Sequence, residues 1–596
     1  MSLQFLPYDL LFNIARDLDI DDVHNLQATC KSLRLFTLTR PVYRQLAHDL
    51  LARSRPLPLH SFQRLSDLST PALIAAVDRA RGFEKAWAIR APRPARPNPY
   101  YGNQWYITIS VPSHEEIDWL SPITSSYTLC ATKSGRVLCW DVRRDICLAE
   151  WDPRSLTCSD GGDEDEDEDD EDKWELWKCR VEFEERTVYF TMARVLKGYH
   201  DDRVMEFMLM LSTIPIPQSA RPVFDTLTSF HTTGVIMNVF LLDPPRRLLS
   251  AFVWIASSNT IGLYVLPDWA KDDYVFVDTG VGCLISSNWS CILHEDQIVI
   301  HSEEADAAYQ HFYPLEENNG DDRPDSLKRL WNKLPKICAR LAPSRSISKN
   351  FVFPSVPGTL DDEDASSQST APATSGPQQP TQDPATPELF TNPYPFPPWY
   401  PESAHFVRQW WPTLPGVPRL SCTVVLLAAH DPETHHTRFV LAQHYFKVPI
   451  ALEVLPVVGE SSTSSSSRSI QANDDDMLHL WYVSTPFEVV CVLEEGDDDE
   501  DTGDRPRPLV AVDFGHAVWN DHPHPHPRRR VPKCLRFVTF PPVHGRRGRT
   551  EEAVVRTLDI PEELDLDVVE TINIDQSQGA VILSVRDGKI FILRYE

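Results

Sequence analysis

The chain has 596 residues, of which 42% are hydrophobic, and a formal net charge of −29. This length exceeds what one hydrophobic core supports, so we expect two or more domains. So acidic a chain is a poor match for nucleic acid. Its twelve Cys form no C-x-x-C pair, which indicates buried thiols and no metal or other cofactor.

Neither a secretory signal nor a membrane span is expected. Asp9, Arg16 and Asp17 interrupt the N-terminal segment, which therefore lacks the apolar core of a signal. The longest apolar run, near Leu248–Ser257, is about half as long as a membrane-spanning helix. We therefore expect a protein of the cytoplasm, the nucleus or both, with no membrane partner.

The first helix is predicted to begin at Leu6-Pro7, because proline suits the first helical turn. Its apolar stripe consists of residues at helical spacing, namely Leu11, Ile14, Ala15 and Leu18. A helix this short buries little apolar area by itself, so we expect Leu6, Leu10 and Leu11 to meet either the rest of the chain or a partner.

Two more short helices follow. Asp21 and Asp22 are expected to cap the second, which carries Val23 and Leu26. Thr29 is expected to cap the third, in which Leu33 and Phe36 face inward, and Pro41 marks its end.

The segment from Leu6 to Pro41 resembles an F-box. The residues that carry the resemblance are, in order, Leu6-Pro7, the Leu10-Leu11 pair, the step from Ile14 to Leu18, an acidic turn, Leu26 and Thr29-Cys30-Lys31-Ser32-Leu33-Arg34. Family members usually carry Glu where this chain has Asp9, and Val where it has Thr29. Neither departure changes the character of the position. The alternative is an ordinary amphipathic helical hairpin.

Residues 42–99 predict a helical stalk that ends in a stiff linker. One apolar stripe comprises Val42, Leu46, Leu50 and Leu51, and a second, capped by Thr70, comprises Pro71, Leu73, Ile74, Val77, Ala80 and Phe83. The Pro-rich segment Ala91–Pro99 stops helix formation, so we place a domain boundary there.

Residues 100–596 predict an all-β body. Roughly two dozen short runs have strand character, which fits six or seven four-stranded blades. Ser134–Val142, with its Ser-Gly turn and its Trp140-Asp141 pair, looks like part of one WD-repeat blade. The fold class is thus α+β multidomain: a three-helix F-box and helical linker, then a WD-repeat-like β-propeller. Two stacked β-sandwiches are the competing architecture.

A propeller must close on itself. Ile107–Val111 is predicted to join the sheet that contains Ile590–Leu593, beside a hairpin turn at Asp587-Gly588. Disordered or acidic insertions are predicted near residues 159–174, 302–420, 459–477 and 495–507. Asp160–Asp172, for example, holds eleven acids in thirteen positions.

No catalytic site is predicted. The His cluster formed by His516, His522, His524 and His526 lies on an alternating His-Pro backbone that does not converge on one ion, so a surface loop is expected. Four large aromatics, Trp399, Tyr400, Trp410 and Trp411, either fold back onto the body or form a recognition loop. No nucleophile, base or metal-ligand set is apparent.

The F-box resemblance implies a non-catalytic substrate receptor of a cullin-RING ubiquitin ligase. It would bind an Skp-type adaptor and, through it, cullin and RING subunits, while the propeller holds an unidentified target protein. The implied adaptor-binding residues are Leu6, Pro7, Leu10, Leu11, Ile14, Leu18, Leu26 and Leu33, although Ile14 and Leu26 could be internal core. The alternative function is a non-ligase interaction scaffold whose helices cap the β body.

Overall fold

A computed structural model describes most of the chain. The described residues are 3–52, 55–59, 63–89, 92–97, 104–110, 115–122, 127–142, 144–153, 173–182, 185–198, 203–213, 223–271, 274–283, 288–294, 296–303, 307–315, 340–350, 404–408, 421–430, 436–446, 478–482, 487–490, 509–521, 533–540 and 555–596.

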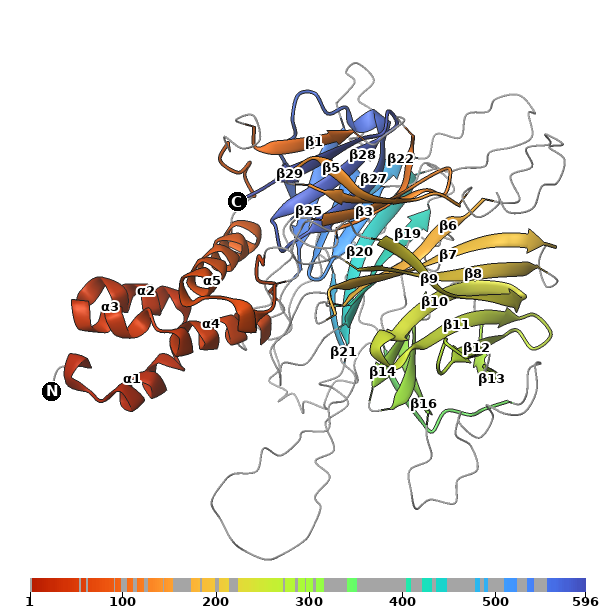
Figure 1. The fold of residues 1–596 in the computed structure, drawn as a ribbon, viewed down its shortest axis with the longest axis horizontal. Helices are drawn as coiled ribbons and strands as arrows, with labels where there is room; N and C mark the ends of the chain where they lie inside the picture. The colour runs from red at the N-terminus through yellow and green to blue at the C-terminus, as the bar shows by residue number, and fades with distance from the viewer. Residues whose placement is uncertain are drawn as a thin grey trace, which may run out of the picture.

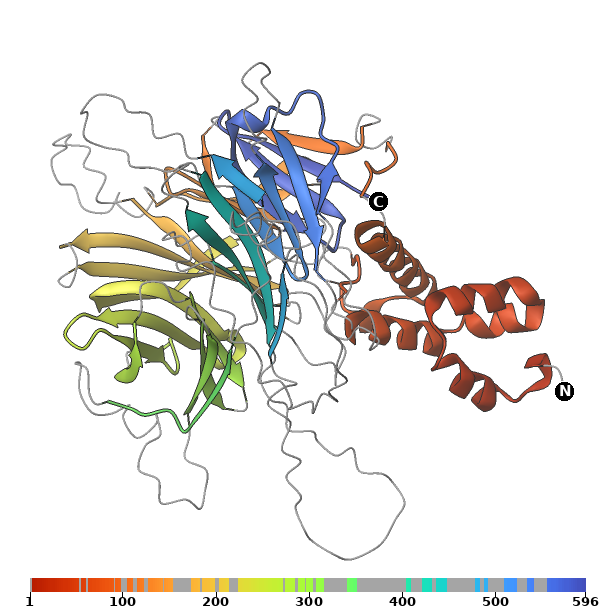
Figure 2. The ribbon, with the colours of Figure 1, turned by 180° about the vertical axis from the view of Figure 1, so that it is seen from behind.

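A helical unit precedes the β body, and Figures 1 and 2 show it projecting from one side of that body. Its α-helices are α1 (Tyr8–Ala15), α2 (Ile20–Thr29), α3 (Lys31–Thr37), α4 (Arg40–Ala52) and α5 (Thr70–Glu84). The short turns are η1 (Leu3–Phe5), η2 (Leu65–Asp67) and the π-helical η3 (Lys85–Ile89). No described helix is long and apolar enough to cross a membrane.

The three predicted N-terminal helices are confirmed, but their caps differ. Asp19 is the N-cap of α2: its carboxylate accepts from the Asp22 amide at 2.8 Å, and the Asp22 carboxylate reaches back to the Asp19 amide. Thr29 is the last residue of α2, and α3 follows Cys30 with no side-chain cap. Pro41 lies in the first turn of α4, where no amide hydrogen is needed, so it does not end a helix.

The helices share one apolar core. All four residues of the predicted α4 stripe are buried, and Leu73, Val77 and Ala80 of α5 are buried with them. Ser69 rather than Thr70 caps α5, accepting from the Ala72 amide, and Pro71 is exposed. Phe514 of the β body belongs to this same core, so the helical unit is packed onto the body.

The described part of the β body forms seven antiparallel sheets, six with four strands and one with five. One sheet consists of β2 (Ile117–Pro122), β3 (Tyr127–Thr132), β4 (Val137–Asp141) and β5 (Ile146–Trp151), and the next consists of β6 (Glu175–Glu182), β7 (Thr187–Lys197), β8 (Val204–Thr213) and β9 (Val223–Thr233). A third sheet consists of β10 (Val235–Asp243), β11 (Leu248–Ile255), β12 (Thr260–Leu266) and β13 (Val275–Gly282). A fourth consists of β14 (Asn288–His294), β15 (Gln297–Glu303), β16 (Ala307–Pro314) and β17 (Arg345–Asn350).

The remaining three sheets follow. The five-stranded sheet consists of β18 (Ala404–Arg408), β19 (Ser421–His430), β20 (His436–Phe446) and β21 (Leu478–Tyr482), with β22 (Phe487–Val490) also paired to β20. The next sheet consists of β23 (Val510–Asp513), β24 (His516–Asp521), β25 (Cys534–Thr539) and β26 (Val555–Leu558). The last sheet consists of β27 (Val569–Asp575), β28 (Ala580–Val585), β29 (Lys589–Arg594) and β1 (Tyr106–Ser110).

This arrangement matches a β-propeller rather than stacked sandwiches. Consecutive strands build each sheet, and the first strands of neighbouring sheets lie side by side, as in β27 with β2 and β10 with β14. Separate apolar clusters fill the spaces between neighbouring sheets.

The predicted closure is confirmed. β1 pairs with β29 in antiparallel register, with Ile107 opposite Ile592 and Ile109 opposite Ile590. The last sheet is therefore completed by a strand from the start of the β body, which ties the two ends of that body together.

Several strands were absent from the sequence prediction. The predicted runs with strand character did not include β2, β9 or β24. The predicted insertion at 302–420 is wrong in extent, because β16, β17 and β18 lie within it. Pairing with a neighbouring strand and packing against the next sheet can make a strand of a mixed polar run that has little strand character of its own.

The linker prediction for Ala91–Pro99 is also corrected. Within its described part, residues 92–97, the Ala95 amide donates to the carbonyl of Arg594 at 2.9 Å, and Pro94 bridges Tyr595. Both Pro92 and Ala95 are buried. The described part of the segment therefore extends the last sheet. Three features noted in the sequence lie outside the described residues. They are the acidic tract Asp160–Asp172, the aromatic residues Trp399, Tyr400, Trp410 and Trp411, and three His residues of the cluster, namely His522, His524 and His526.

Candidate docking surface on the N-terminal helices

Exposed large apolar side chains concentrate on the helical unit. Seven such residues occur in the described part of the chain, and five of them lie between Phe5 and Leu35. Their exposed fractions are Phe5 77%, Tyr8 46%, Leu10 50%, Ile14 39% and Leu35 72%. We call these five residues the apolar surface. Isolated exposed leucines are common, whereas larger exposed apolar patches are typical of interaction sites.

Helix geometry separates the surface of α1 from its buried face. Leu11 and Ala15, four residues apart, point into the core, with exposed fractions of 8% and 3%. Leu10 and Ile14 are likewise four apart and therefore lie on one face of α1, about 100° from the first pair. The Tyr8 ring meets the Phe36 ring edge-on at 5.3 Å, which joins α1 to α3.

The eight residues implied by the resemblance fall into three groups. Pro7, Leu10 and Ile14 are exposed; Leu6, Leu18 and Leu26 are partly buried against the helical core; and Leu11 and Leu33 are buried in it. Leu11 and Leu33 therefore hold the helices together and offer no surface. Phe5, Tyr8 and Leu35 were missed by the sequence analysis because all three lie off the predicted apolar stripe.

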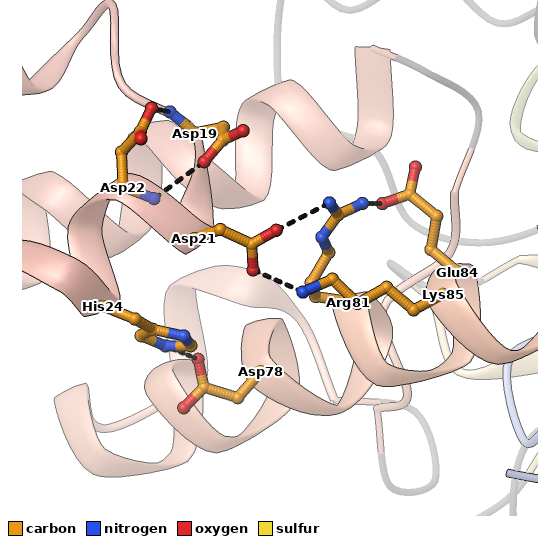
Figure 3. A network of polar contacts seen from close by, with 8 residues as sticks. All are labelled: Asp19, Asp21, Asp22, His24, Asp78, Arg81, Glu84 and Lys85. Carbon is orange, nitrogen blue, oxygen red and sulfur yellow. Dashed lines mark hydrogen bonds and ion pairs between the residues drawn. The ribbon is translucent and has the colours of Figure 1, made fainter. Parts of the chain in front are cut away.

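Ion pairs fix α2 against α5, as Figure 3 shows. The Asp21 carboxylate accepts from Lys85 at 2.6 Å and from Arg81 at 3.0 Å, and Arg81 also donates to Glu84. Lys85 and Arg81 hold the pKa of Asp21 below its ordinary value. Asp21 is thus a structural link and not the cap expected from sequence.

A second polar link lies one turn along α2. His24 of α2 contacts the carboxylate of Asp78 in α5 at 3.1 Å, also drawn in Figure 3. The hydroxyl of Tyr43 in α4 accepts from Gln27 at 3.1 Å and donates to Asp78 at 3.5 Å. Three helices are joined through these side chains, so the apolar surface is presented on a fixed frame.

His516 connects the helical unit to the β body. This residue was expected in a surface loop, but it lies in β24 with an exposed fraction of 3%. The Nε2 atom of His516 accepts a hydrogen bond from Arg55 at 3.1 Å, and its Nδ1 atom donates one to the Thr539 hydroxyl at 3.1 Å. The Thr539 hydroxyl in turn donates to the Trp87 carbonyl at 2.7 Å. This chain of bonds requires neutral His516.

The surroundings keep His516 neutral. Burial, followed by the neighbouring charge of Arg55, holds its pKa well below 6.5. The Trp87 ring packs edge-on against the rings of His516 and Phe537 at 5.0 and 5.1 Å. Trp87 therefore contacts β24 and β25 with its ring and its backbone, and we call this contact the junction.

No group of three or more His, Cys, Asp or Glu among the described residues could hold a metal ion. A cavity at the junction, lined by Arg55, Glu84, Trp87, His516 and Gln576 among others, has about 20 Å³. That volume accepts a single water molecule and no organic substrate.

Comparison with known proteins gives only distant likeness. No family model matches the sequence, and no curated protein matches it. Among solved structures, the chain is similar to the WD40 domain of SCAP from fission yeast (9% identity, 82% of this chain and 98% of that one, TM-score 0.34). It is also similar to the β-propeller domain of Myceliophteria thermophila Cps50 (Swd1) (9% identity, 81% and 98%, TM-score 0.32). Because both TM-scores are below 0.5, the description of the fold rests on the strand pairing given above.

Proposed function

We propose that this chain is the substrate-receptor subunit of an Skp–cullin–F-box type ubiquitin ligase. The helical unit docks an Skp-type adaptor, and the β-propeller binds a target protein. The observation that carries the proposal is the apolar surface, which the β body leaves uncovered although it packs against the other side of the same helices.

An exposed apolar face on the first helix favours a receptor over a scaffold. A scaffold whose helices only cap the body would bury the face of Leu10 and Ile14 against residues beyond 100. Both side chains are instead exposed, by 50% and 39%. Among the described residues of the β body, only Phe514 joins the helical core. Removing the apolar surface from water on binding would supply the main favourable free energy of docking.

The chain needs no active site for this role. Ubiquitin would be transferred from a conjugating enzyme bound to the RING subunit, and the receptor would raise the effective concentration of the target near that enzyme. The junction at Trp87 and His516 supports this role, because a fixed angle between adaptor site and propeller favours productive geometry. We place the complex in the cytoplasm, the nucleus or both.

The test is co-purification of an Skp-type adaptor and cullin with the full chain and with a Leu10→Asp/Ile14→Asp variant. Both residues are exposed, so the variant should fold, whereas a change at the buried Leu11 would confound folding with binding. Placing carboxylates in an apolar interface costs about 2 kcal/mol or more, which is at least a thirtyfold loss of affinity. The matched control is Ile146→Asp/Leu227→Asp, which changes two exposed apolar residues of the β body.

Wild type and control should retain adaptor and cullin, and the α1 variant should lose both while keeping its thermal unfolding midpoint. If wild type binds no adaptor, the ligase proposal is wrong and the scaffold function takes its place. If the α1 variant binds as well as wild type, the adaptor contacts a different surface.

A further inference from the structure

Positive charge is concentrated in one part of the helical unit. Residues 1–90 contain twelve Lys and Arg against nine Asp and Glu, whereas the whole chain has 57 against 86. Between Asp22 and Asp49 there is no acidic residue, and the four cations of this stretch are Lys31, Arg34, Arg40 and Arg44. A basic stretch in so acidic a chain points to an acidic partner.

The structure separates structural cations from unused ones. Arg40 is structural, because its guanidinium donates to the carbonyl oxygens of Leu65, Ser66 and Leu68. Lys31 and Arg34, both exposed, form no ion pair with any described residue. Arg81 and Lys85, by contrast, are engaged with Asp21 as described above.

Helix α3 places these two cations beside the most exposed leucine of the described chain. Leu33, Phe36 and Thr37 form the buried face of α3. Leu35 points away from that face, with an exposed fraction of 72%. Lys31 precedes Leu35 by four residues, so the two side chains are neighbours, and Arg34 flanks them on the same outward side. We call Lys31, Arg34 and Leu35 the basic face.

The basic face shares Leu35 with the apolar surface already assigned to the adaptor. Two cations around an apolar side chain suit an apolar socket rimmed by carboxylates. A phosphate backbone would gain nothing from Leu35, so a protein partner is favoured over nucleic acid.

We propose that the basic face forms the charged edge of the adaptor interface. Leu35 enters an apolar socket of the adaptor, and Lys31 and Arg34 pair with Asp or Glu side chains around that socket. This proposal rests on the proposed function and adds the chemistry of the partner: an adaptor whose docking surface is acidic at this edge. The cations set orientation and association rate, while the apolar contacts supply most of the affinity.

The experiment measures the Kd of a purified Skp-type adaptor for the full chain at 50 mM and 500 mM NaCl. The variants are Lys31→Glu/Arg34→Glu and Leu35→Ala. The matched control, Lys197→Glu/Lys271→Glu, makes the same change of charge at two exposed lysines of the β body. Thermal unfolding of each variant checks that the fold is kept.

We expect Lys31→Glu/Arg34→Glu to weaken binding about tenfold at low salt and about twofold at high salt, because salt screens exposed charges. Leu35→Ala should weaken binding by a similar factor at both salt concentrations. The control should stay within about twofold of wild type.

Three results would overturn the inference, and they are distinguishable. If wild type binds the adaptor and Lys31→Glu/Arg34→Glu binds it with the same Kd, the role of the basic face is rejected and the proposed function stands. Absence of adaptor binding by wild type would reject both. Binding of polyuridylate RNA or of phosphatidylserine vesicles that is lost in the same variant would assign the cations to a polyanion instead.

Discussion

Asp513 provides a test of the burial between the last two sheets. Its carboxylate ends β23, has an exposed fraction of 3%, and accepts from the amides of Phe514 at 2.7 Å and Gln576 at 3.1 Å. Burial raises its pKa to about 6, the neighbouring Asp575 adds to the rise, and the hydrogen bonds oppose it. We predict that this carboxyl makes the fold less stable as pH rises.

The sign follows from proton binding. Between pH 3.8 and about 6 the folded chain holds a proton at Asp513 that the unfolded chain has released, so the free energy of unfolding falls as pH rises through this window. The shift corresponds to about 3 kcal/mol in total, of which about half is lost between pH 5 and 7.5. His516 acts oppositely, because its lowered pKa makes stability rise with pH up to its unfolded value of 6.5.

The assay is urea unfolding of wild type and Asp513→Asn at pH 5.0 and 7.5, followed by tryptophan fluorescence. The asparagine has one acceptor oxygen for two amides, so its absolute stability also contains the cost of a lost bond, about 1–3 kcal/mol. The difference in pH dependence is free of that cost: wild type should lose about 1 kcal/mol more than the variant over this interval. Equal pH dependence in both proteins would refute the argument from burial.

The other predictions concern the junction and the turn at Gly579. Trp87→Ala should lower the free energy of unfolding by about 3–5 kcal/mol, because it leaves a cavity between η3 and β25. Limited proteolysis should cleave this variant near residue 90 sooner than wild type or Trp254→Ala, a control at a half-buried tryptophan. Unchanged cleavage would show that the Trp87 ring does not hold the helical unit. Gly579 has φ +65°, and a Cβ there would lie 2.6 Å from the Tyr595 carbonyl oxygen. Gly579→Ala should therefore lower the free energy of unfolding by about 2 kcal/mol or more, measured by thermal unfolding. Gly282 has open space around it, so the control Gly282→Ala should lower it by less than about 1 kcal/mol.

Much of the fold could be predicted from the sequence because local periodicity reports which side chains face a core. The α4 stripe of Val42, Leu46, Leu50 and Leu51 is buried as predicted, since 3.6-residue spacing leaves few alternatives. The requirement that a propeller close on itself predicted the pairing of β1 with β29, because an open end strand needs a partner.

The candidate site was predicted only in part. The apolar stripe of α1 was assigned without knowing which of its residues meet the other helices. Leu10 and Leu11 are adjacent in sequence and chemically identical, yet the first is 50% exposed and the second 8%. Only the packing of α1 on the other helices decides between them, because both are consistent with an amphipathic helix.

Contacts between distant segments were decided by the tertiary structure alone. His516 stands in a His-rich stretch typical of a loop, but Arg55, 461 residues earlier, becomes its hydrogen-bond partner within a buried junction. The Pro-rich segment around Pro94 has the composition of a linker, but Tyr595 at the other end of the chain pairs with it. Sequence determines the local conformations that a segment can adopt. Which partner buries it depends on long-range packing, which no local pattern encodes.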